Sequence, residues 1–316
     1  LDRSSAESDV YKRQEVKIPF SIKLDIDFRI FSEFFMKNPP SELKVACVQL
    51  TSGIDLEYNR QQVEVALQEA VENGAQWIVL PEAVNLLQQK NPLARATAVT
   101  EEEDPVLKYC QDIAGKAGVW IHVGSLILHN STGDGRLLNR GFIIDDQGKI
   151  RARYDKIHLF DAILSDQESY RESASFEAGK EAVLLQTPWG GYGMSICYDM
   201  RFPHLYRTLS QAGAQILAIP AAFTRPTGKA HWHTLLRARA IENGCFVIAA
   251  AQCGEHQDGR ATYGHSLIIS PWGEILAEAG ETPFNLYGTI SLTEPERVRY
   301  KVPAWQHQPQ FRLTSC

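Results

Sequence analysis

The chain has 316 residues, of which 44% are hydrophobic and 22% charged, and its formal net charge is −6 at pH 7. This composition is typical of a globular protein that is large enough to bury an extensive core. The acidic balance argues against a surface dedicated to nucleic acid or to an anionic membrane, so neither is expected as a partner. The six cysteines show no C-x-x-C spacing, which favours free thiols in a reducing compartment, and we expect a cytoplasmic protein.

The first 35 residues differ in character from the rest. Residues 1–14 resemble the translated read-through of a sequencing adapter, and Met36 is the candidate start. We therefore expect residues 1–35 to be a disordered, non-native leader and residues 36–316 to form a single domain. No apolar run approaches the roughly 18 residues of a membrane span.

From residue 36 onward, short apolar runs alternate with amphipathic stretches. In chain order the first half predicts strand 44–50, helix 59–73, strand 77–80, helix 107–117, strand 119–128 and a hairpin over 141–154. The second half predicts strand 182–186, a strand that ends at Cys197, helix 204–212, strand 215–219, helix 231–243, strand 246–251 and a hairpin over 267–277. Because strands outnumber the helices that would cover them, the pattern predicts a layered α/β sandwich.

The run 193–202 is the most informative part of the sequence, because it delivers Cys197 from an apolar strand to a sharp turn crowded with polar side chains. A strand end fixes the position of a thiol, and the turn leaves backbone N–H groups free to face a developing oxyanion. A nucleophile is one interpretation. The alternative is a small buried hydrophobic residue, since free cysteines are often buried.

Two further segments place an ionisable group at the edge of the core. The apolar run 77–81 ends at Glu82, and Lys156 lies within the largely apolar stretch 154–160. Buried charges need partners, so a purely structural Glu82–Lys156 ion pair is the alternative to a catalytic role.

These three segments, with Glu172 in the run 170–173, resemble the Glu-Lys-Cys motifs of the nitrilase, or carbon–nitrogen hydrolase, superfamily. The resemblance extends from about residue 44 to 310. The runs 221–228, 237–242, 249–254 and 263–266 are most similar to the branch that includes deaminated glutathione amidases. The resemblance implies a four-layer α-β-β-α sandwich, a homodimer or larger homo-oligomer, and no cofactor.

For such an enzyme we expect Glu82 to act as base and Cys197 as nucleophile, with Lys156 and the backbone N–H of Tyr198 holding the oxyanion. Glu172 would orient Lys156 or the substrate amide. A rival Cys-His scheme could use one of several histidines. They are His158, His204, His231, His233 and His265.

Arg201, four residues after Cys197, is the candidate for gripping a substrate carboxylate. An ion pair with Asp199 or Glu242 is the alternative. The resemblance adds Phe223 and Thr227 as pocket walls. His231 and His233 lack accompanying ligands at a zinc-like spacing, so no metal site is expected.

The expected reaction is the hydrolysis, by water through a thioester, of a small carboxylate-bearing amide to acid and ammonia. The resemblance favours deaminated glutathione, in metabolite repair. An ω-amidase acting on 2-oxoglutaramate or succinamate is the main alternative. A true nitrilase and a non-catalytic binding protein on the same scaffold are the others.

Overall fold

The computed structural model describes residues 40–130, 134–165, 168–307 and 313–314. The expectation for residues 1–35 lies outside these ranges. The strands are β1 (Glu42–Gln49), β2 (Trp77–Val79), β3 (Trp120–His129), β4 (Leu137–Ile144), β5 (Ile150–Asp155), β6 (Asp161–Ser165), β7 (Glu168–Arg171), β8 (Leu184–Thr187), β9 (Gly190–Gly193), β10 (Ala214–Ala218), β11 (Phe246–Ala249), β12 (Cys253–Glu255), β13 (Ala261–Tyr263), β14 (Leu267–Ile269), β15 (Ile275–Glu278) and β16 (Phe284–Ser291). The helices are α2 (Leu56–Glu72), α3 (Asn91–Thr97), α4 (Pro105–Ala117), α5 (Pro203–Gln211), α6 (Arg225–Asn243) and α7 (Glu294–Lys301), and the 3₁₀ turns are η1 (Glu172–Ala174), η2 (Cys197–Arg201) and η3 (Pro303–Gln306).

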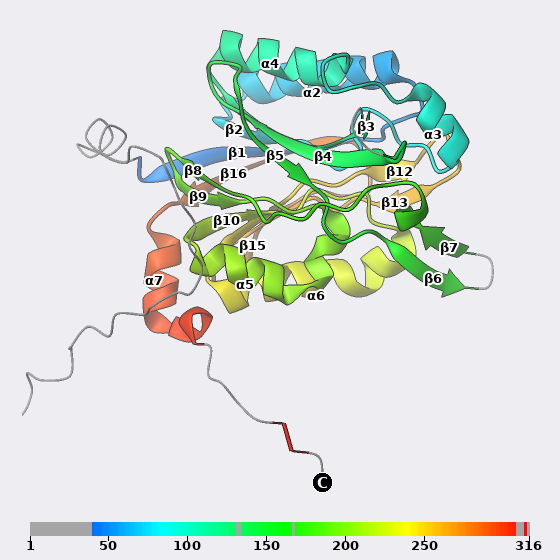
Figure 1. The fold of residues 1–316 in the computed structure, drawn as a ribbon. Helices are drawn as coiled ribbons and strands as arrows, with labels where there is room; N and C mark the ends of the chain where they lie inside the picture. The colour runs from blue at the N-terminus through cyan, green and yellow to red at the C-terminus, as the bar shows by residue number, and fades with distance from the viewer. Residues whose placement is uncertain (1–39, 131–133, 166–167, 308–312, 315–316) are drawn as a thin grey trace, which may run out of the picture. The chain divides into compact units, whose positions relative to one another are not determined.

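Two six-stranded sheets form the centre of the domain. One has the strand order β16-β1-β2-β3-β4-β5, and the other has the order β15-β14-β11-β10-β9-β8. Helices α2 and α4 cover the outer face of the first sheet, and α5 and α6 cover the outer face of the second (Figure 1). The predicted four-layer α-β-β-α sandwich is therefore confirmed.

Strand β1 illustrates why the layers form. Its residues alternate between two faces, as in any strand. Leu43, Val45 and Cys47 belong to the apolar cluster between the sheets, whereas Ala46 and Val48 belong to the cluster beneath α2 and α4. A strand that is apolar on both faces must be covered on both, which the helix layers and the second sheet provide.

The structure confirms the main predicted elements, with boundaries that move by a few residues. Helix α6 begins at Arg225, earlier than the predicted 231, because Pro226 occupies its first turn, where a missing N–H costs nothing. Strand β9 ends at Gly193, and the extended backbone that follows, with Ile196 at φ −136° and ψ 118°, carries the chain to Cys197. Within the described ranges, no helix is long and apolar enough to cross a bilayer.

Candidate active site

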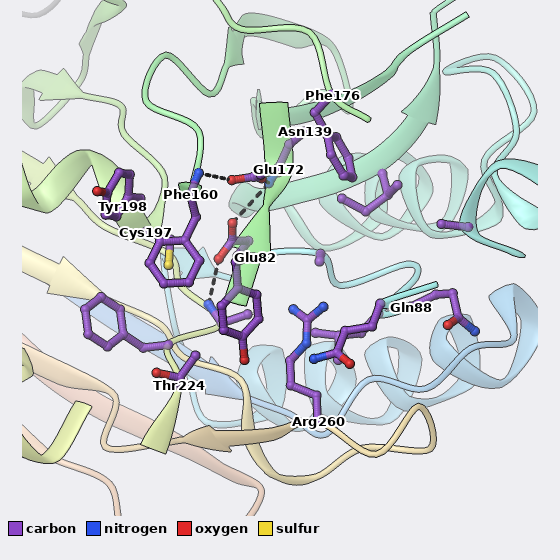
Figure 2. Close-up of a pocket in the computed structure, with 18 of the residues that line it drawn as sticks. Glu82, Gln88, Asn139, Phe160, Glu172, Phe176, Cys197, Tyr198, Thr224 and Arg260 are labelled. Carbon is purple, nitrogen blue, oxygen red and sulfur yellow. Dashed lines mark hydrogen bonds between the residues drawn. The ribbon is translucent and has the colours of Figure 1, made fainter. Parts of the chain in front are cut away.

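A cavity of about 790 Å³ lies where loops from both sheets meet. Glu82, Lys156, Glu172 and Cys197 all line it, so the structure brings the four predicted catalytic residues together. Figure 2 labels Glu82, Glu172 and Cys197 in this cavity. Glu82 follows β2 and Lys156 directly follows β5, both in the first sheet, whereas Cys197 follows β9 of the second. The site thus joins the two halves of the sandwich.

The loop that carries Glu82 is tightly fixed. Ala83 has a φ of +54°, which is uncommon for a residue other than glycine. Beneath this loop, a Cβ added at Gly124 of β3 would lie only 2.0 Å from the carbonyl oxygen of Leu80. Only glycine allows this close approach of β3 to the backbone that leads to Glu82.

The cysteine turn is also strained and firmly anchored. Cys197 has a φ of +48°, and its backbone N–H donates to the carbonyl of Pro220 at 2.9 Å. The fully buried Asp199 carboxylate accepts bonds from the Ile196 N–H at 2.8 Å and from the Tyr154 hydroxyl at 2.7 Å. Strain that is held by its surroundings in this way is typical of functional sites.

The backbone N–H of Tyr198 is directed by the same turn. Among the residues that the structure describes, it has no hydrogen-bond acceptor. Tyr198 lines the cavity beside Cys197. A free backbone donor next to a nucleophile is what stabilisation of an oxyanion requires.

Lys156 is the centre of the buried polar cluster. Its Nζ donates to Glu82 Oε1 at 2.9 Å and to the two carboxylate oxygens of Glu172 at 3.0 and 2.9 Å. The side chains of Lys156 and Glu82 are only 3% and 7% exposed, respectively. The ammonium is therefore fixed between two carboxylates at the floor of the cavity.

Asn139 of β4 is a member of this cluster that the sequence analysis missed. Its Nδ2 donates to Glu82 Oε1 at 3.0 Å and to Glu172 Oε1 at 3.3 Å, so it holds the two carboxylates together with Lys156. Backbone donors fix the remaining oxygens, since the Ala222 N–H reaches Glu82 Oε2 at 2.7 Å and the Phe160 N–H reaches Glu172 Oε2 at 2.6 Å. Figure 2 shows these contacts around the cavity.

Burial and charge set the protonation of the three central groups. Burial, together with the neighbouring Glu82 carboxylate, raises the pKa of the Cys197 thiol well above its ordinary value, and Lys156 opposes this only in part. Burial alone would raise the pKa of Glu82, but the Lys156 ammonium holds it below its usual range. Although burial disfavours a charged Lys156, Glu172 and Glu82 hold its pKa well above the ordinary value.

At neutral pH the site therefore contains a neutral thiol, an ionised Glu82 and an ammonium. A thiol must lose its proton to become a good nucleophile. Glu82 interacts directly with the thiol and is ionised, so it is the adjacent proton acceptor. The arrangement is suited to nucleophilic attack with general-base assistance.

The histidines of the rival scheme face other groups. His158 places Nδ1 2.7 Å from Asp199 Oδ1 and stacks on Phe202 with ring centroids 3.6 Å apart. His231 contacts Arg201, while His233 and His265 both contact Glu278. No histidine of the described ranges lines the cavity.

The predicted substrate-binding residues differ in their positions. Phe223 and Thr227 line the cavity, but Arg201 is not among the lining residues. The Arg201 guanidinium lies 3.3 Å from His231 Nδ1 and packs on the rings of Tyr198 and Phe223, at 5.8 and 5.3 Å from their centroids. It forms neither of the ion pairs that were considered as alternatives, since Glu242 pairs with Arg239.

Other basic residues do line the cavity. They are Lys90, Arg171, Arg225 and Arg260. Arg260 extends into the cavity beside Gln88 (Figure 2). Its buried Nε has no hydrogen-bond partner and lies 3.9 Å from the Asp258 carboxylate. The sequence offered little signal for this residue, because it lies in the polar loop between β12 and β13.

Comparisons with known proteins agree with this geometry. A family model described as carbon-nitrogen hydrolase matches residues 44–300. A deaminated glutathione amidase from Synechocystis sp. is 42% identical over 266 residues, which cover 83% of this chain and 97% of the relative. The structure is similar to the Caenorhabditis elegans NitFhit protein, with a TM-score of 0.78 and 36% identity over 86% of this chain and 66% of that one.

A second solved structure gives the same result. Saccharomyces cerevisiae Nit3, a member of branch 10 of the nitrilase superfamily, has a TM-score of 0.77 and 28% identity, over 86% of this chain and 97% of its own. The chain therefore belongs to the carbon–nitrogen hydrolase family, within the nitrilase superfamily, and is a hydrolase of carbon–nitrogen bonds.

Proposed function

We propose that this protein is an amidase that hydrolyses a carboxylate-bearing amide through a thioester on Cys197, with deaminated glutathione as the best-fitting substrate. One observation carries the mechanism. An ammonium is fixed between two carboxylates that line the cavity, beside a thiol whose pKa is raised by burial and by the Glu82 carboxylate.

In the first half of the reaction, Cys197 Sγ attacks the amide carbonyl carbon while Glu82 takes the thiol proton. The carbonyl oxygen gains the negative charge and is held by Lys156 Nζ and the free N–H of Tyr198. Glu82 then gives its proton to the amide nitrogen. The C–N bond breaks, the amine leaves, and the acyl group remains on Cys197 as a thioester.

In the second half, water attacks the thioester carbon and Glu82 takes a proton from that water. The C–S bond breaks, the acid is released, and the proton returns to Cys197 Sγ. Glu172 contacts no reacting atom in this scheme. It is a positioning residue that holds Lys156, and Phe160 N–H and Asn139 in turn hold Glu172.

The charge of the cavity favours an anionic substrate. Of the described residues that line it, five are basic and two are acidic, although the whole chain has a net charge of −6. Of the five basic residues, Arg225 directly follows Thr224 in the chain, and Arg260 extends into the cavity beside Gln88, apart from the cluster of Glu82, Asn139 and Glu172 (Figure 2). A substrate with carboxylates beyond its scissile amide matches this distribution.

Deaminated glutathione meets this requirement, because its 2-oxo acid and its glycine each carry a carboxylate. The relatives that bear this name align along most of the chain. The cavity of about 790 Å³ is within the range that accommodates a ligand of this size. A substrate with one carboxylate, such as 2-oxoglutaramate, would leave part of the cavity and its positive charge unused.

The leaving group follows from the substrate. Deaminated glutathione has no primary amide, so cleavage of its bond to cysteine releases a peptide amine. Ammonia, the product expected from the sequence, is released only from primary amides such as 2-oxoglutaramate. An assay with separate detection of ammonia and of a new peptide amino group distinguishes the two substrates.

The test is a panel of deaminated glutathione, 2-oxoglutaramate, an uncharged amide of similar length and a simple nitrile. The proposal predicts the highest kcat/KM for deaminated glutathione, with release of an amine. A higher value for 2-oxoglutaramate, with release of ammonia, would establish the ω-amidase instead. Turnover of none of the four would contradict the amidase proposal.

We propose that the Arg260 guanidinium, which extends into the cavity, binds a substrate carboxylate. A point charge cannot reproduce the two parallel hydrogen bonds of a guanidinium, so Arg→Lys costs about 1–3 kcal/mol where the carboxylate binds. Arg260→Lys should lower kcat/KM for deaminated glutathione more than for the uncharged amide, whereas Arg201→Lys, which changes a side chain behind the wall, should lower both to a similar extent. A variant that lowers both equally would show that its arginine only supports the wall.

The five described cysteines are all free and buried, which supports the proposal of a reducing, cytoplasmic compartment. We also propose a homodimer or larger homo-oligomer. Light scattering after size exclusion tests it, and a mass equal to one chain would overturn it.

A further inference from the structure

Three side chains of the types that can bind metal ions lie together at the surface, where α6 meets the second sheet. They are His233 on α6, His265 in the segment between β13 and β14, and Glu278 at the end of β15. One ligand atom from each lies within 4.8 Å of the other two. The three residues are far apart in the sequence, which explains why no spacing motif indicated them.

The ligand atoms converge on one point. His233 Nε2 and His265 Nδ1 each lie 2.9 Å from the same oxygen of Glu278, Oε1. The side chains are 31%, 20% and 35% exposed, in the order His233, His265 and Glu278. A dissolved ion can therefore reach them, while their packing limits their motion.

The backbone holds His265 in place independently of these side-chain contacts. Its N–H donates to the Gly280 carbonyl at 3.0 Å, and its carbonyl accepts from Trp232 Nε1 at 2.8 Å. The first bond ties His265 to a residue two positions after Glu278, and the second ties it to the residue directly before His233. The Tyr263 ring stacks on the His265 imidazole with centroids 4.4 Å apart. Such preorganisation lowers the entropic cost of binding an ion.

We propose that His233 Nε2, His265 Nδ1 and the Glu278 carboxylate bind a divalent zinc-like cation. Two imidazole nitrogens and a carboxylate oxygen are a donor set that Zn²⁺ accepts, with water in the fourth position of a tetrahedron. Each imidazole binds through the nitrogen that now faces Glu278, so its proton moves to the other nitrogen. For His265 that nitrogen, Nε2, faces the Glu281 carboxylate at 3.9 Å, which favours the required tautomer.

The ion would connect α6 to the segment between β13 and β14, at the back of the cavity wall. Tyr263, which stacks on His265, also donates its N–H to the carbonyl of the wall residue Phe223 at 2.9 Å. The site exists only in the folded protein, because it combines side chains from three elements. An ion that binds this folded state and not the unfolded chain raises the melting temperature of the protein.

The experiment titrates the full chain, after removal of metal with a chelator, with Zn²⁺ alone. Calorimetry should give one site per chain, and Zn²⁺ should raise the melting temperature. His233→Gln, Glu278→Gln and His265→Asn should each weaken binding at least about 100-fold, since even loss of an outer partner of a ligand costs about 10–100-fold. Asparagine is chosen at position 265 because it tolerates the φ of +55° there.

Two controls make the result specific. His129→Gln removes an exposed histidine at the end of β3 and should leave Zn²⁺ binding unchanged. Cys197→Ser removes the cavity thiol and should also leave it unchanged. The proposal is overturned if the wild type binds no Zn²⁺, or if binding survives the three cluster variants. Because each variant is compared with and without Zn²⁺, a general loss of stability is separated from loss of the ion.

Discussion

Cys197 and Cys245 are both buried cysteines with a cationic neighbour, yet their surroundings differ in every other respect. Arg299 Nη2 lies 3.0 Å from Cys245 Sγ and also donates to the Ala214 carbonyl at 2.6 Å. Burial still dominates, and it raises the pKa of Cys245 to about 11. The nearby Arg299 cation therefore does not offset the effect of burial on the pKa of this thiol.

Three features are found at Cys197 and not in what the structure describes of Cys245. Cys197 lines a cavity, interacts with an ionised carboxylate, and precedes a free backbone donor in a turn with positive φ. Cys245 is fully buried between α6 and β11, and its Sγ donates to the Ala214 carbonyl at 3.2 Å. We therefore propose that access, an adjacent base and an oxyanion site make Cys197 reactive, and that the Lys156 cation contributes to the oxyanion site.

The largest effect should come from replacing the sulfur atom of Cys197 with oxygen. Cys197→Ser should lower kcat by about 10⁴-fold or more, because a serine hydroxyl is far less acidic than a thiol and the triad acts as a unit. Cys245→Ser, the matched control, should keep nearly full activity. Steady-state rates of the two purified variants test this, and substantial turnover by Cys197→Ser would contradict a thiol mechanism.

Removal of the Glu82 carboxylate should leave Cys197 without a proton acceptor. Glu82→Gln keeps the shape of the side chain but cannot accept a proton, so kcat should fall about 10²–10⁴-fold. In the wild type, activity should be lost only as the pH falls through the lowered pKa of Glu82, in a range more acidic than that of an ordinary glutamate. If Glu82→Gln is active and a His158 variant is dead, the Cys-His scheme is correct instead.

Lys156→Met should keep a stem of similar length and remove the positive charge from the oxyanion site. We expect kcat to fall about 10²–10³-fold, with a smaller change in KM. The variant also leaves Glu82 and Glu172 without their shared ammonium, so its melting temperature must be measured in parallel. A change in KM alone would show that Lys156 binds substrate and does not stabilise the transition state.

Asn139→Leu should have the smallest effect of the four. It removes one donor that both carboxylates share, and a hydrogen bond to a charged group contributes about 1.5–3 kcal/mol, which corresponds to about a 10–100-fold loss of kcat. Asn285→Leu is the control, because Asn285 is a buried asparagine in β16 that donates to the Ala66 carbonyl. Asn285→Leu should lower the stability of the protein without lowering kcat. Equal kcat values for the two variants would show that Asn139 is only structural.

The sequence allowed the layers and the triad to be predicted because their signals are local. Apolar alternation marked β1, β3 and the β4–β5 hairpin, and a charge at the end of an apolar run marked Glu82 and Lys156. Strand β16 was missed because Asn285 and Gly288 interrupt its apolar pattern, and its pairing with β1 joins residues far apart in the chain. Helix α3 has only seven residues and begins with Asn91-Pro92, so it also has little periodicity.

The rest of the site depends on tertiary contacts. Asn139 lies beside Arg140 in the polar part of a largely apolar strand, and only the fold shows that Asn139 reaches two carboxylates. Arg201 was placed near the substrate from its distance along the chain to Cys197, but η2 turns its guanidinium toward His231. The cluster of His233, His265 and Glu278 needed the same information, since it combines residues from three elements.

The difference between the two cysteines is tested most directly by rapid-quench mass spectrometry of the wild-type enzyme during turnover of deaminated glutathione. An acyl adduct should form on Cys197, rise before steady state and disappear as substrate is exhausted, while Cys245 carries none. Glu82→Gln should accumulate little of it. Turnover with no adduct on Cys197 at any time, or an adduct on another cysteine, would contradict the account.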